Sequence, residues 1–254
     1  MKEEFYHGGY WKGRMINATE YLLESLNYLK ALTTVHQAFN DLEIYNKTID
    51  KNIPVDLNED SFKTTIFPLI YSEDTWYFKP NGTKDTNLTL DSYSPSGFSM
   101  TYSNSKDKTL SITIRAGMYP EIHENVDGNG DEIPNCVLIY FPKNEWQELY
   151  QLEIMEKLLT TTINHWQPYH ARIISHELSE ETHGKAPIIA GYLTYFQLDI
   201  DIEGLDEYFT IKRVDGIGTL YILKIDTFSA ENPECIQKVS MLENTLRRHN
   251  LLIM

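Results

Sequence analysis

The sequence predicts an α+β fold with mostly antiparallel sheet and three main helices, at about 17–46, 144–163 and 233–250. Apolar residues recur at helical spacing in these three segments, whereas the segments between them alternate apolar and polar residues as strands do. Strict strand–helix alternation, the mark of a parallel sheet, is missing from the sequence. We expect residues 1–254 to form one domain, and a two-lobed layout divided near residue 142 is the alternative.

The N-terminal part of the chain predicts a strand followed by the first helix. Residues 5–11 are rich in aromatic side chains, which favour strands. Asn17 suits the N-cap position, because its side chain can accept a hydrogen bond from the first turn. Behind it, one mostly apolar stripe recurs at spacings of three and four: Ala18, Leu22, Ser25, Leu29, Leu32, Val35, Phe39 and Leu42.

Strand patterns follow at residues 88–90, 97–103 and 110–114. The polar residues 104–108 separate the last two, which indicates an antiparallel hairpin with one face in water. Asn81-Gly82 is a further turn signal.

The second half of the chain repeats the order of strands and then a helix. Residues 136–141 predict a buried strand, and the helix at 144–163 precedes Pro168. Further strands are expected at 171–175, 188–197, 209–214 and 219–225, with a tight turn at Asp215-Gly216. Asn232 and Pro233 favour the start of the last helix.

Composition restricts the partners and the compartment. Twenty-two basic against 37 acidic residues give a net charge of −15, which disfavours nucleic acids and anionic membranes as direct partners and suits a basic protein. The start of the chain lacks a signal-peptide pattern and no apolar run approaches the ~20 residues of a membrane helix, so we expect a cytoplasmic protein. Cys136 and Cys235 are expected to be reduced.

Motifs of enzymes and metal sites are weak. Asp127–Glu132 has the alternating oxygen ligands of a calcium loop but lacks the glycine and glutamate that an EF-hand requires. His176 and His183 are seven residues apart, which does not fit a zinc-binding helix, and we expect a loop there. Nucleophile elbows and phosphate loops are missing. We therefore predict no enzyme activity, cofactor or metal, and a small cytoplasmic hydrolase with an acidic cleft is the alternative.

Negative charge is concentrated in two stretches that contain no Lys or Arg. We define the first acidic stretch by five residues and the second by five more. They are Glu121, Glu124, Asp127, Asp131 and Glu132, and then Asp199, Asp201, Glu203, Asp206 and Glu207. Solvation of a soluble protein is one explanation. The alternative is a docking surface that attracts a basic partner.

Several short motifs, in this order and spacing, resemble the immunity protein 52 family of bacterial polymorphic toxin systems. They are Tyr10-Trp11-Lys12-Gly13-Arg14, residues 135–142, Trp166-Gln167-Pro168-Tyr169-His170-Ala171, Gly191-Tyr192-Leu193-Thr194-Tyr195, and the Gly216/Gly218 turn before Asn232-Pro233. The resemblance spans about residues 6–252. Tyr192 departs from the family, in which many members have Trp after the glycine.

The resemblance implies a cytoplasmic antitoxin that binds and neutralises a secreted toxin, often one of a type VI secretion system. Toxins paired with this family include restriction-endonuclease-like nucleases, whose basic surfaces an acidic inhibitor could occupy. An adaptor or chaperone that loads the toxin is a further alternative. We expect the acidic stretches to bind the toxin and the motif residues to be structural: Tyr10, Trp11, Gly13, Arg14, Trp166, Pro168, Gly191, Tyr192, Tyr195, Gly216 and Gly218.

Overall fold

The computed structural model describes residues 3–71, 77–118, 135–183, 190–198, 204–214 and 216–248. Within them, ten strands form one sheet: β1 (Phe5–Trp11), β2 (Leu42–Asn46), β3 (Lys51–Pro54), β6 (Ser96–Asn104), β7 (Ser111–Met118), β8 (Asn135–Tyr140), β9 (His170–Ser175), β10 (Leu193–Phe196), β11 (Phe209–Val214) and β12 (Gly218–Leu223). Two short strands, β4 (Tyr77–Phe78) and β5 (Lys84–Asp85), pair with each other.

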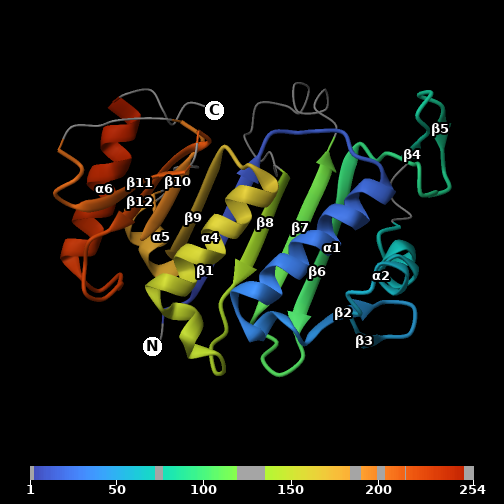
Figure 1. The fold of residues 1–254 in the computed structure, drawn as a ribbon, viewed down its shortest axis with the longest axis horizontal. Helices are drawn as coiled ribbons and strands as arrows, with labels where there is room; N and C mark the ends of the chain where they lie inside the picture. Colours follow the sequence, from blue (N-terminus) through green and yellow to red (C-terminus); the bar gives the residue numbers. More distant parts are fainter. Residues whose placement is uncertain are drawn as a thin grey trace.

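The strand order in the large sheet is β11-β12-β10-β9-β1-β8-β7-β6-β2-β3, and every neighbouring pair is antiparallel (Figure 1). The N-terminal strand β1 is therefore central. Tyr6 lies opposite Tyr140 of β8 on one side and opposite Ile174 of β9 on the other. The sheet thus runs without a break across residue 142, and the two-lobed alternative stays a prediction.

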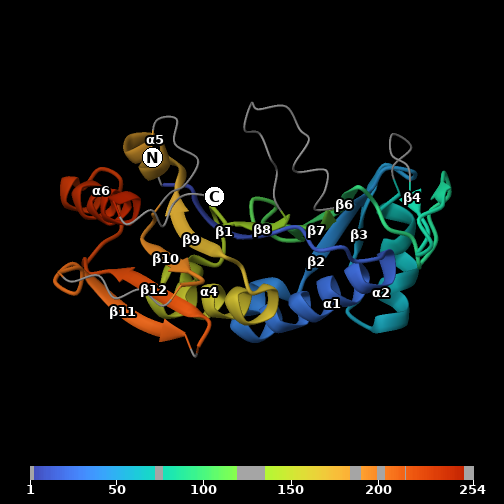
Figure 2. The ribbon, with the colours of Figure 1, turned by 90° about the horizontal axis from the view of Figure 1, so that it is seen from above.

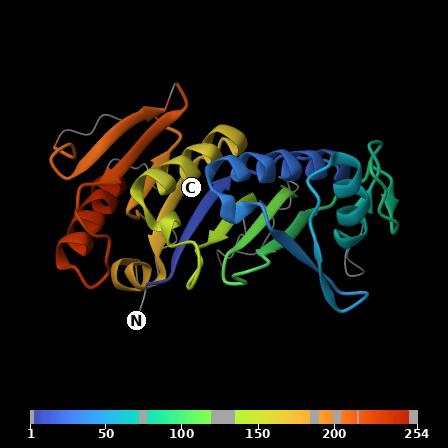
Figure 3. The same cartoon turned by 60° about the horizontal axis from the view of Figure 1, so that its bottom comes forward.

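Helices cover the two faces of the sheet unequally. The described helices are α1 (Ala18–Val35), α2 (Glu59–Ile66), α4 (Leu152–Trp166), α5 (His176–His183) and α6 (Pro233–Arg248). Viewed from above, α1, α2 and α4 lie on one face of the sheet, and α5 and α6 lie on the other face near β9 to β12 (Figure 2). Figure 3 shows α4 and α1 following one another across the strands of their shared face.

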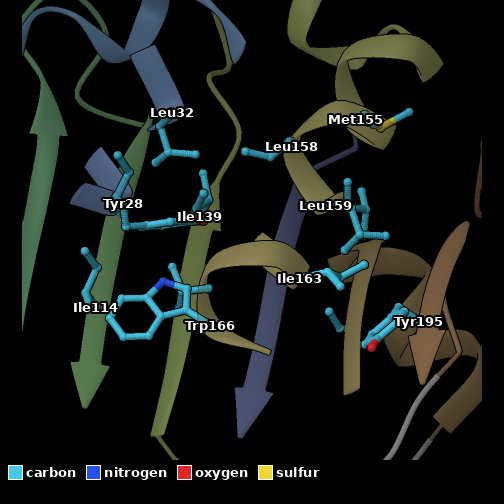
Figure 4. Packing of buried hydrophobic residues seen from close by; sticks show 14 of the residues in the cluster. Tyr28, Leu32, Ile114, Ile139, Met155, Leu158, Leu159, Ile163, Trp166 and Tyr195 are labelled. Carbon is cyan, nitrogen blue, oxygen red and sulfur yellow. The ribbon is translucent and has the colours of Figure 1, made fainter. Parts of the chain in front are cut away.

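The core fills the space between α1, α4 and the sheet. Figure 4 shows Tyr28 and Leu32 of α1 beside Leu158 of α4, above the strand residue Ile139, and all four are at most 1% exposed. Their apolar faces leave water together, which is the dominant favourable contribution to folding. The stripe predicted from sequence is the face of α1 that is buried.

The predicted α+β class with a large antiparallel sheet is confirmed, but the predicted count of three main helices is not exact. Among the described residues there are two further helices, α2 and α5. Residues 176–183 were expected to be a loop, yet they form α5. Its first residue, His176, donates its backbone N–H to the carbonyl of Glu4 at 2.9 Å, so the helix starts where β9 meets the N-terminal strand.

The bounds of the long helices also differ from expectation. The first helix ends at Val35 rather than near 46, because His36 adopts an extended backbone, with φ −156° and ψ 147°. Thr33, Thr34 and Val35 are β-branched and extend a helix poorly. Residues 37–39 form a 3-10 turn and residues 42–46 form β2, so Phe39 and Leu42 keep helical spacing only by coincidence.

The second helix begins at Leu152 rather than at 144 and ends at Trp166. Trp146, with φ 56°, and the 3-10 turn Gln147–Tyr150 occupy the expected first turns. The third begins at Pro233 as expected, and its expected last residues, 249 and 250, lie outside the described residues. The predicted N-cap of the first helix is confirmed: Asn17 Oδ1 accepts from Glu20 N at 2.9 Å, and Glu20 Oε2 accepts from Asn17 N at 2.8 Å.

The predicted hairpin between β6 and β7 is also confirmed, with Thr101 opposite Thr113. Asn81-Gly82 lies in the turn between β4 and β5, where Gly82 has φ 78°. None of the described helices is both long enough and apolar enough to span a membrane.

Candidate interaction surface on the open sheet face

Four central strands, β6, β7, β8 and β1, carry no helix of the described chain on the face opposite α1 and α4 (Figure 2). On β6 burial alternates as the pleat requires, whereas most positions of β1 and β8 are buried. Inward-facing Tyr102, Ile112 and Ile139 are at most 1% exposed. We call this surface the open face. The expected sheet with one wet face is therefore present.

Two chemistries divide the open face. On β6 and β7 the outward positions are mostly hydroxyl-bearing, and Thr101 Oγ1 lies 2.8 Å from Thr113 Oγ1. On β8 the outward positions are Cys136, Leu138 and Tyr140, and on β1 they are Tyr6, Gly8 and Tyr10; Cys136 and Gly8 among them are buried. Tyr140, the last residue of β8, is 47% exposed, so a large aromatic side chain contacts solvent at the end of a central strand. Exposed aromatic side chains of this kind are typical of binding surfaces.

A shallow depression of about 380 Å³ lies at the aromatic end of the open face. Its lining residues are Glu4, Tyr6, Tyr10, Leu138, Tyr140 and His176. Gly8 is the outward residue between Tyr6 and Tyr10. A Cβ there would lie 2.7 Å from the Tyr10 hydroxyl, so the glycine allows the Tyr10 ring to lie along the strand. The tyrosine depression, as we name it, thus depends on Gly8.

Arg172 of β9 packs beside the depression. Its Cζ lies 5.8 Å from the centroid of the Tyr6 ring and 5.6 Å from that of Tyr10, and one terminal nitrogen donates to the Tyr6 hydroxyl at 3.4 Å. Burial raises the pKa of Tyr10, although the charge of Arg172 opposes the shift. Two of the rings already pack against a guanidinium group of this chain.

A buried polar network holds β1 against α4 on the other side of the sheet. His7 Nδ1 lies 3.0 Å from the carbonyl oxygen of Arg172, and Nε2 lies 2.8 Å from Thr162 Oγ1. Because a carbonyl only accepts, Nδ1 carries the proton and neutral Nε2 accepts from the threonine. Burial lowers the pKa of His7 to about 4, although the bond to Arg172 raises it. The ring is therefore neutral at pH 7.

The acidic stretches predicted as the toxin-binding surface are described only in part. The whole first stretch and three residues of the second, Asp199, Asp201 and Glu203, lie outside the described residues. Asp206 and Glu207 lie in the segment before β11, and both are exposed. They are thus available to a partner, and the role of the stretches stays a prediction.

Most of the motif residues around α4 are buried in the core. Trp11 ends β1 and stacks on Trp166, with ring centroids 4.6 Å apart, and Pro168 is buried just beyond. Arg14 follows the half-buried Gly13 and places its Cζ 5.8 Å from the centroid of the Trp166 ring. Tyr10 differs, because it faces the open side of the sheet.

The motif residues of the C-terminal half pack around β10. Gly191 and Gly218 approach neighbouring backbone so closely that a Cβ would lie 2.3 Å from the carbonyl oxygen of Ile173 and 2.1 Å from that of Phe196. Tyr192 is fully buried, and Tyr195 donates its hydroxyl to the carbonyl of Ile217 at 3.1 Å. Gly216 has φ 65°, the left-handed conformation that the turn between β11 and β12 requires.

Sequence reasoning missed Tyr6, Leu138 and Tyr140 as surface residues. The apolar run 136–141 predicted a strand buried on both faces, but Leu138 is half-buried and Tyr140 is exposed. The phenol hydroxyl of Tyr140 was the available signal, because it tolerates water where Val137 and Ile139 do not.

The calcium and zinc motifs considered in the sequence gain no support from the described residues. No three His, Cys, Asp or Glu side chains among them lie close enough together to hold a metal ion. His176 Nε2 instead lies 3.3 Å from Glu180 Oε1, one helical turn away. Asp127–Glu132 lies outside the described residues.

The fold is similar to that of a solved bacterial protein. A Pseudomonas aeruginosa T6SS protein, PA0821, superposes with a TM-score of 0.50 at 12% sequence identity, covering 96% of this chain and 72% of that one. At this identity the likeness concerns the fold alone. No known protein family and no curated protein sequence matches the chain. The resemblance to the immunity protein 52 family therefore stays a prediction.

Proposed function

We propose that this chain is an immunity protein that binds a cognate toxin and neutralises it by covering the toxin's active site or nucleic-acid groove. The observation that carries the proposal is the open face: four central strands of a ten-stranded sheet present outward-facing side chains, with an aromatic residue 47% exposed among them. Such a face offers a large, rigid surface to a protein partner.

Charge favours a basic partner of the nuclease class. The chain carries −15, and a nuclease presents Lys and Arg to phosphate groups. An acidic inhibitor is attracted to the same surface and excludes the nucleic acid from it. The likeness to a T6SS protein agrees with a role in toxin secretion systems, since such systems deliver toxins against which the producing cell needs protection.

The proposed mechanism requires no chemistry from this chain itself. Inhibition follows from occupying the groove, and the affinity comes from buried area, a few anchor residues and complementary charge. We accordingly propose that the protein is not an enzyme and acts in the cytoplasm, before its toxin reaches nucleic acid.

The proposal predicts that a larger toxin gene lies beside the gene of this chain, and co-expression of the two genes tests it. We expect host cells that express the toxin to survive only when this chain is present. We also expect the two proteins to co-purify, and plasmid DNA to stay intact when the chain is added at an equimolar ratio. A toxin variant that lacks its nuclease activity should still co-purify, which separates binding from survival.

Other outcomes distinguish the alternatives. A complex that forms but still degrades DNA indicates a loading adaptor or chaperone. Hydrolysis of small ester or glycoside substrates by the purified chain, with no binding to the toxin, indicates the hydrolase. Either outcome contradicts an immunity role.

A further inference from the structure

Three neighbouring strands of the open face, β6, β7 and β8, place their outward side chains in three cross-strand rows. The nine residues, row by row, are Ser103, Ser111 and Tyr140; Thr101, Thr113 and Leu138; and Ser99, Arg115 and Cys136. Arg115 is the only one of these nine that is charged at pH 7. This part of the open face is thus a neutral surface, rich in hydroxyl groups, that contains one cation.

The half-buried guanidinium group of Arg115 lacks the acceptors that other arginines have. Its Nε is buried without a hydrogen-bond partner, and Arg115 forms no ion pair with any residue that the structure describes. By contrast, Arg14 and Arg247 pair with carboxylates at 3.8 and 2.7 Å. Its neighbours in the row carry no negative charge. Ser99 is a neutral alcohol, and burial raises the pKa of the Cys136 thiol to about 11, although the charge of Arg115 opposes the shift.

Such a group is unfavourable for the folded chain by itself. A donor on a charged side chain that is buried without an acceptor costs free energy, because it has lost water and gained no partner. Thr113, on the same strand and face, shows that a neutral residue satisfies the pleat equally well. Proteins keep groups of this kind mainly at functional sites. Arg115 therefore marks a site that is incomplete until a bound molecule supplies the acceptor.

A carboxylate of a protein partner is the acceptor that fits the surroundings best. Guanidinium groups bind carboxylates and phosphates through paired hydrogen bonds. The phosphates of a nucleic acid are disfavoured, because the chain carries −15 and Arg115 is the only cation in its three rows. Ser99 is exposed beside it, and the hydroxyl oxygens of Thr101 and Thr113 lie 2.8 Å apart in the next row. These hydroxyl groups are further donors for the same carboxylate.

From this arrangement we infer that Arg115 binds an aspartate or glutamate side chain of the protein partner, which docks on the open face beside Ser99. The inference rests on the proposed function, because it names one contact of the toxin interface. A basic toxin and an acidic contact are compatible. A metal-dependent nuclease holds its divalent ion with carboxylates, inside a groove that otherwise attracts phosphate.

Arg115→Met tests the site in the free chain and in the complex. The probe is the purified toxin from the gene that the proposed function places beside the gene of this chain. We expect the affinity for the toxin to fall about 10- to 100-fold, because charge-assisted hydrogen bonds are lost. The free variant should unfold at the same urea concentration as the wild type or at a higher one, because no internal partner loses a bond. A lower unfolding midpoint with unchanged affinity identifies a structural arginine and overturns the inference.

Lys63→Met is the matched control for net charge. Lys63 belongs to α2, which lies on the face of the sheet opposite the open face (Figure 2). The substitution removes the same charge, and we expect it to change the affinity by less than about 3-fold. If Lys63→Met and Arg115→Met weaken binding equally, the net charge explains the loss and the inference is wrong.

Arg115→Lys identifies the acceptor directly. The variant places an amine near the partner's carboxylate, and a carbodiimide joins amines to carboxylates without a spacer. We expect mass spectrometry of the treated complex to show position 115 joined to an Asp or Glu of the toxin. A lysine at that toxin position should then restore most of the affinity that Arg115→Glu loses, because the two charges are exchanged. A complex that forms without any cross-link from position 115 contradicts the inference.

The possible failures are distinguishable. If the wild-type chain neither binds the toxin nor protects cells, the proposed function fails and the inference fails with it. If the wild type binds and protects, and Arg115→Met does so equally well, only the inference is wrong. If the wild type binds a DNA oligonucleotide and Arg115→Met abolishes that binding, the acceptor is a phosphate, which also contradicts the inference.

Discussion

The indole of Trp11 stacks on the indole of Trp166, with ring centroids 4.6 Å apart and planes 11° from parallel. The two residues end β1 and α4, which are 155 positions apart along the chain. Tyr28 of α1 meets the Trp166 ring edge-on at 5.8 Å, so three elements converge at one aromatic contact. This contact fixes where α4 ends on the sheet.

Trp166→Ala should destabilise the protein strongly. The side chain is 2% exposed, and truncating a buried tryptophan costs about 3–5 kcal/mol because it leaves a cavity as well as losing burial. Leu152→Ala, on the same helix at 42% exposure, should change stability by only about 0.5 kcal/mol. Urea unfolding measures both. A loss below about 1 kcal/mol for Trp166→Ala contradicts the central place of the contact.

His7 should make the protein less stable in mild acid. Its pKa is about 4 in the fold and 6.5 when free, so the unfolded chain binds its proton first as the pH falls. Stability is complete above about pH 6.5, and His7 should remove up to about 3 kcal/mol as the pH approaches 4. In His7→Gln this part of the pH dependence should disappear. Denaturant titrations at pH 7, 5.5 and 4.5 measure the free energy of unfolding of the wild type and of His7→Gln. If both proteins lose the same free energy as the pH falls, the prediction is wrong.

Asp107 should stabilise the junction between the β6–β7 turn and the segment before α4. Its Oδ2 accepts from Asn144 N at 2.9 Å and Glu145 N at 3.0 Å, and Oδ1 accepts from Thr109 N at 3.0 Å. Burial alone raises the pKa of this carboxyl, but the hydrogen bonds outweigh it and lower the pKa from 3.8 to about 2.

The lowered pKa means that the contribution of Asp107 is complete above pH 3.8 and is lost as the pH falls towards 2. Asp107→Asn should therefore cost about 2 kcal/mol at pH 7 and less at pH 2.5. Asp41→Asn, which removes a pair with Lys106 at the surface, should cost under about 1 kcal/mol. Unfolding free energies of the wild type and Asp107→Asn at the two pH values test this prediction. If the destabilisation by Asp107→Asn is as large at pH 2.5 as at pH 7, the ionised carboxylate does not provide the stabilisation.

Glu3 should hold α6 in place. Its Oε2 accepts from the Tyr192 hydroxyl at 2.9 Å, and its Oε1 accepts from Ser229 Oγ at 2.8 Å and from Ala230 N. Glu3→Gln places an amide donor among these donors, so the amides of α6 should exchange with solvent faster, while those of α1 stay unchanged. Glu4→Gln, at a more exposed neighbour, is the control. Unchanged exchange in α6 shows that the helix docks without this carboxylate.

Reversing the charge of an acidic stretch should slow binding to a basic toxin. Replacing all five carboxylates of the first stretch by lysine should lower the association rate, because like charges repel before contact. The same change in the second stretch, which includes exposed Asp206 and Glu207, is an independent trial. Higher salt should mimic both, as the Debye length falls from ~10 Å at 0.1 M to ~3 Å at 1 M. Unchanged rates in folded variants place the interface elsewhere.

The sequence alone determined the elements whose cause is local. Asn17 caps α1 because its side chain reaches the first turn, and the β6–β7 hairpin forms because two alternating segments are joined by a short polar link. Local spacing also misled: Phe39 and Leu42 continue the stripe of α1, although the helix has ended at Val35. Periodicity reports which face is apolar, but it does not report where the backbone turns.

Only the tertiary structure decided the order of the strands and the exposed side of the sheet. Tyr6 meets Tyr140 and Ile174 because β1 inserts between strands more than 130 and 160 residues away, and such pairings leave no mark in the neighbouring sequence. Whether Tyr140 is core or surface depends on which face α1, α4, α5 and α6 cover. The packing of helices from distant parts of the chain therefore decides that these strand residues are exposed and form the tyrosine depression. The sequence predicts only that they belong to strands.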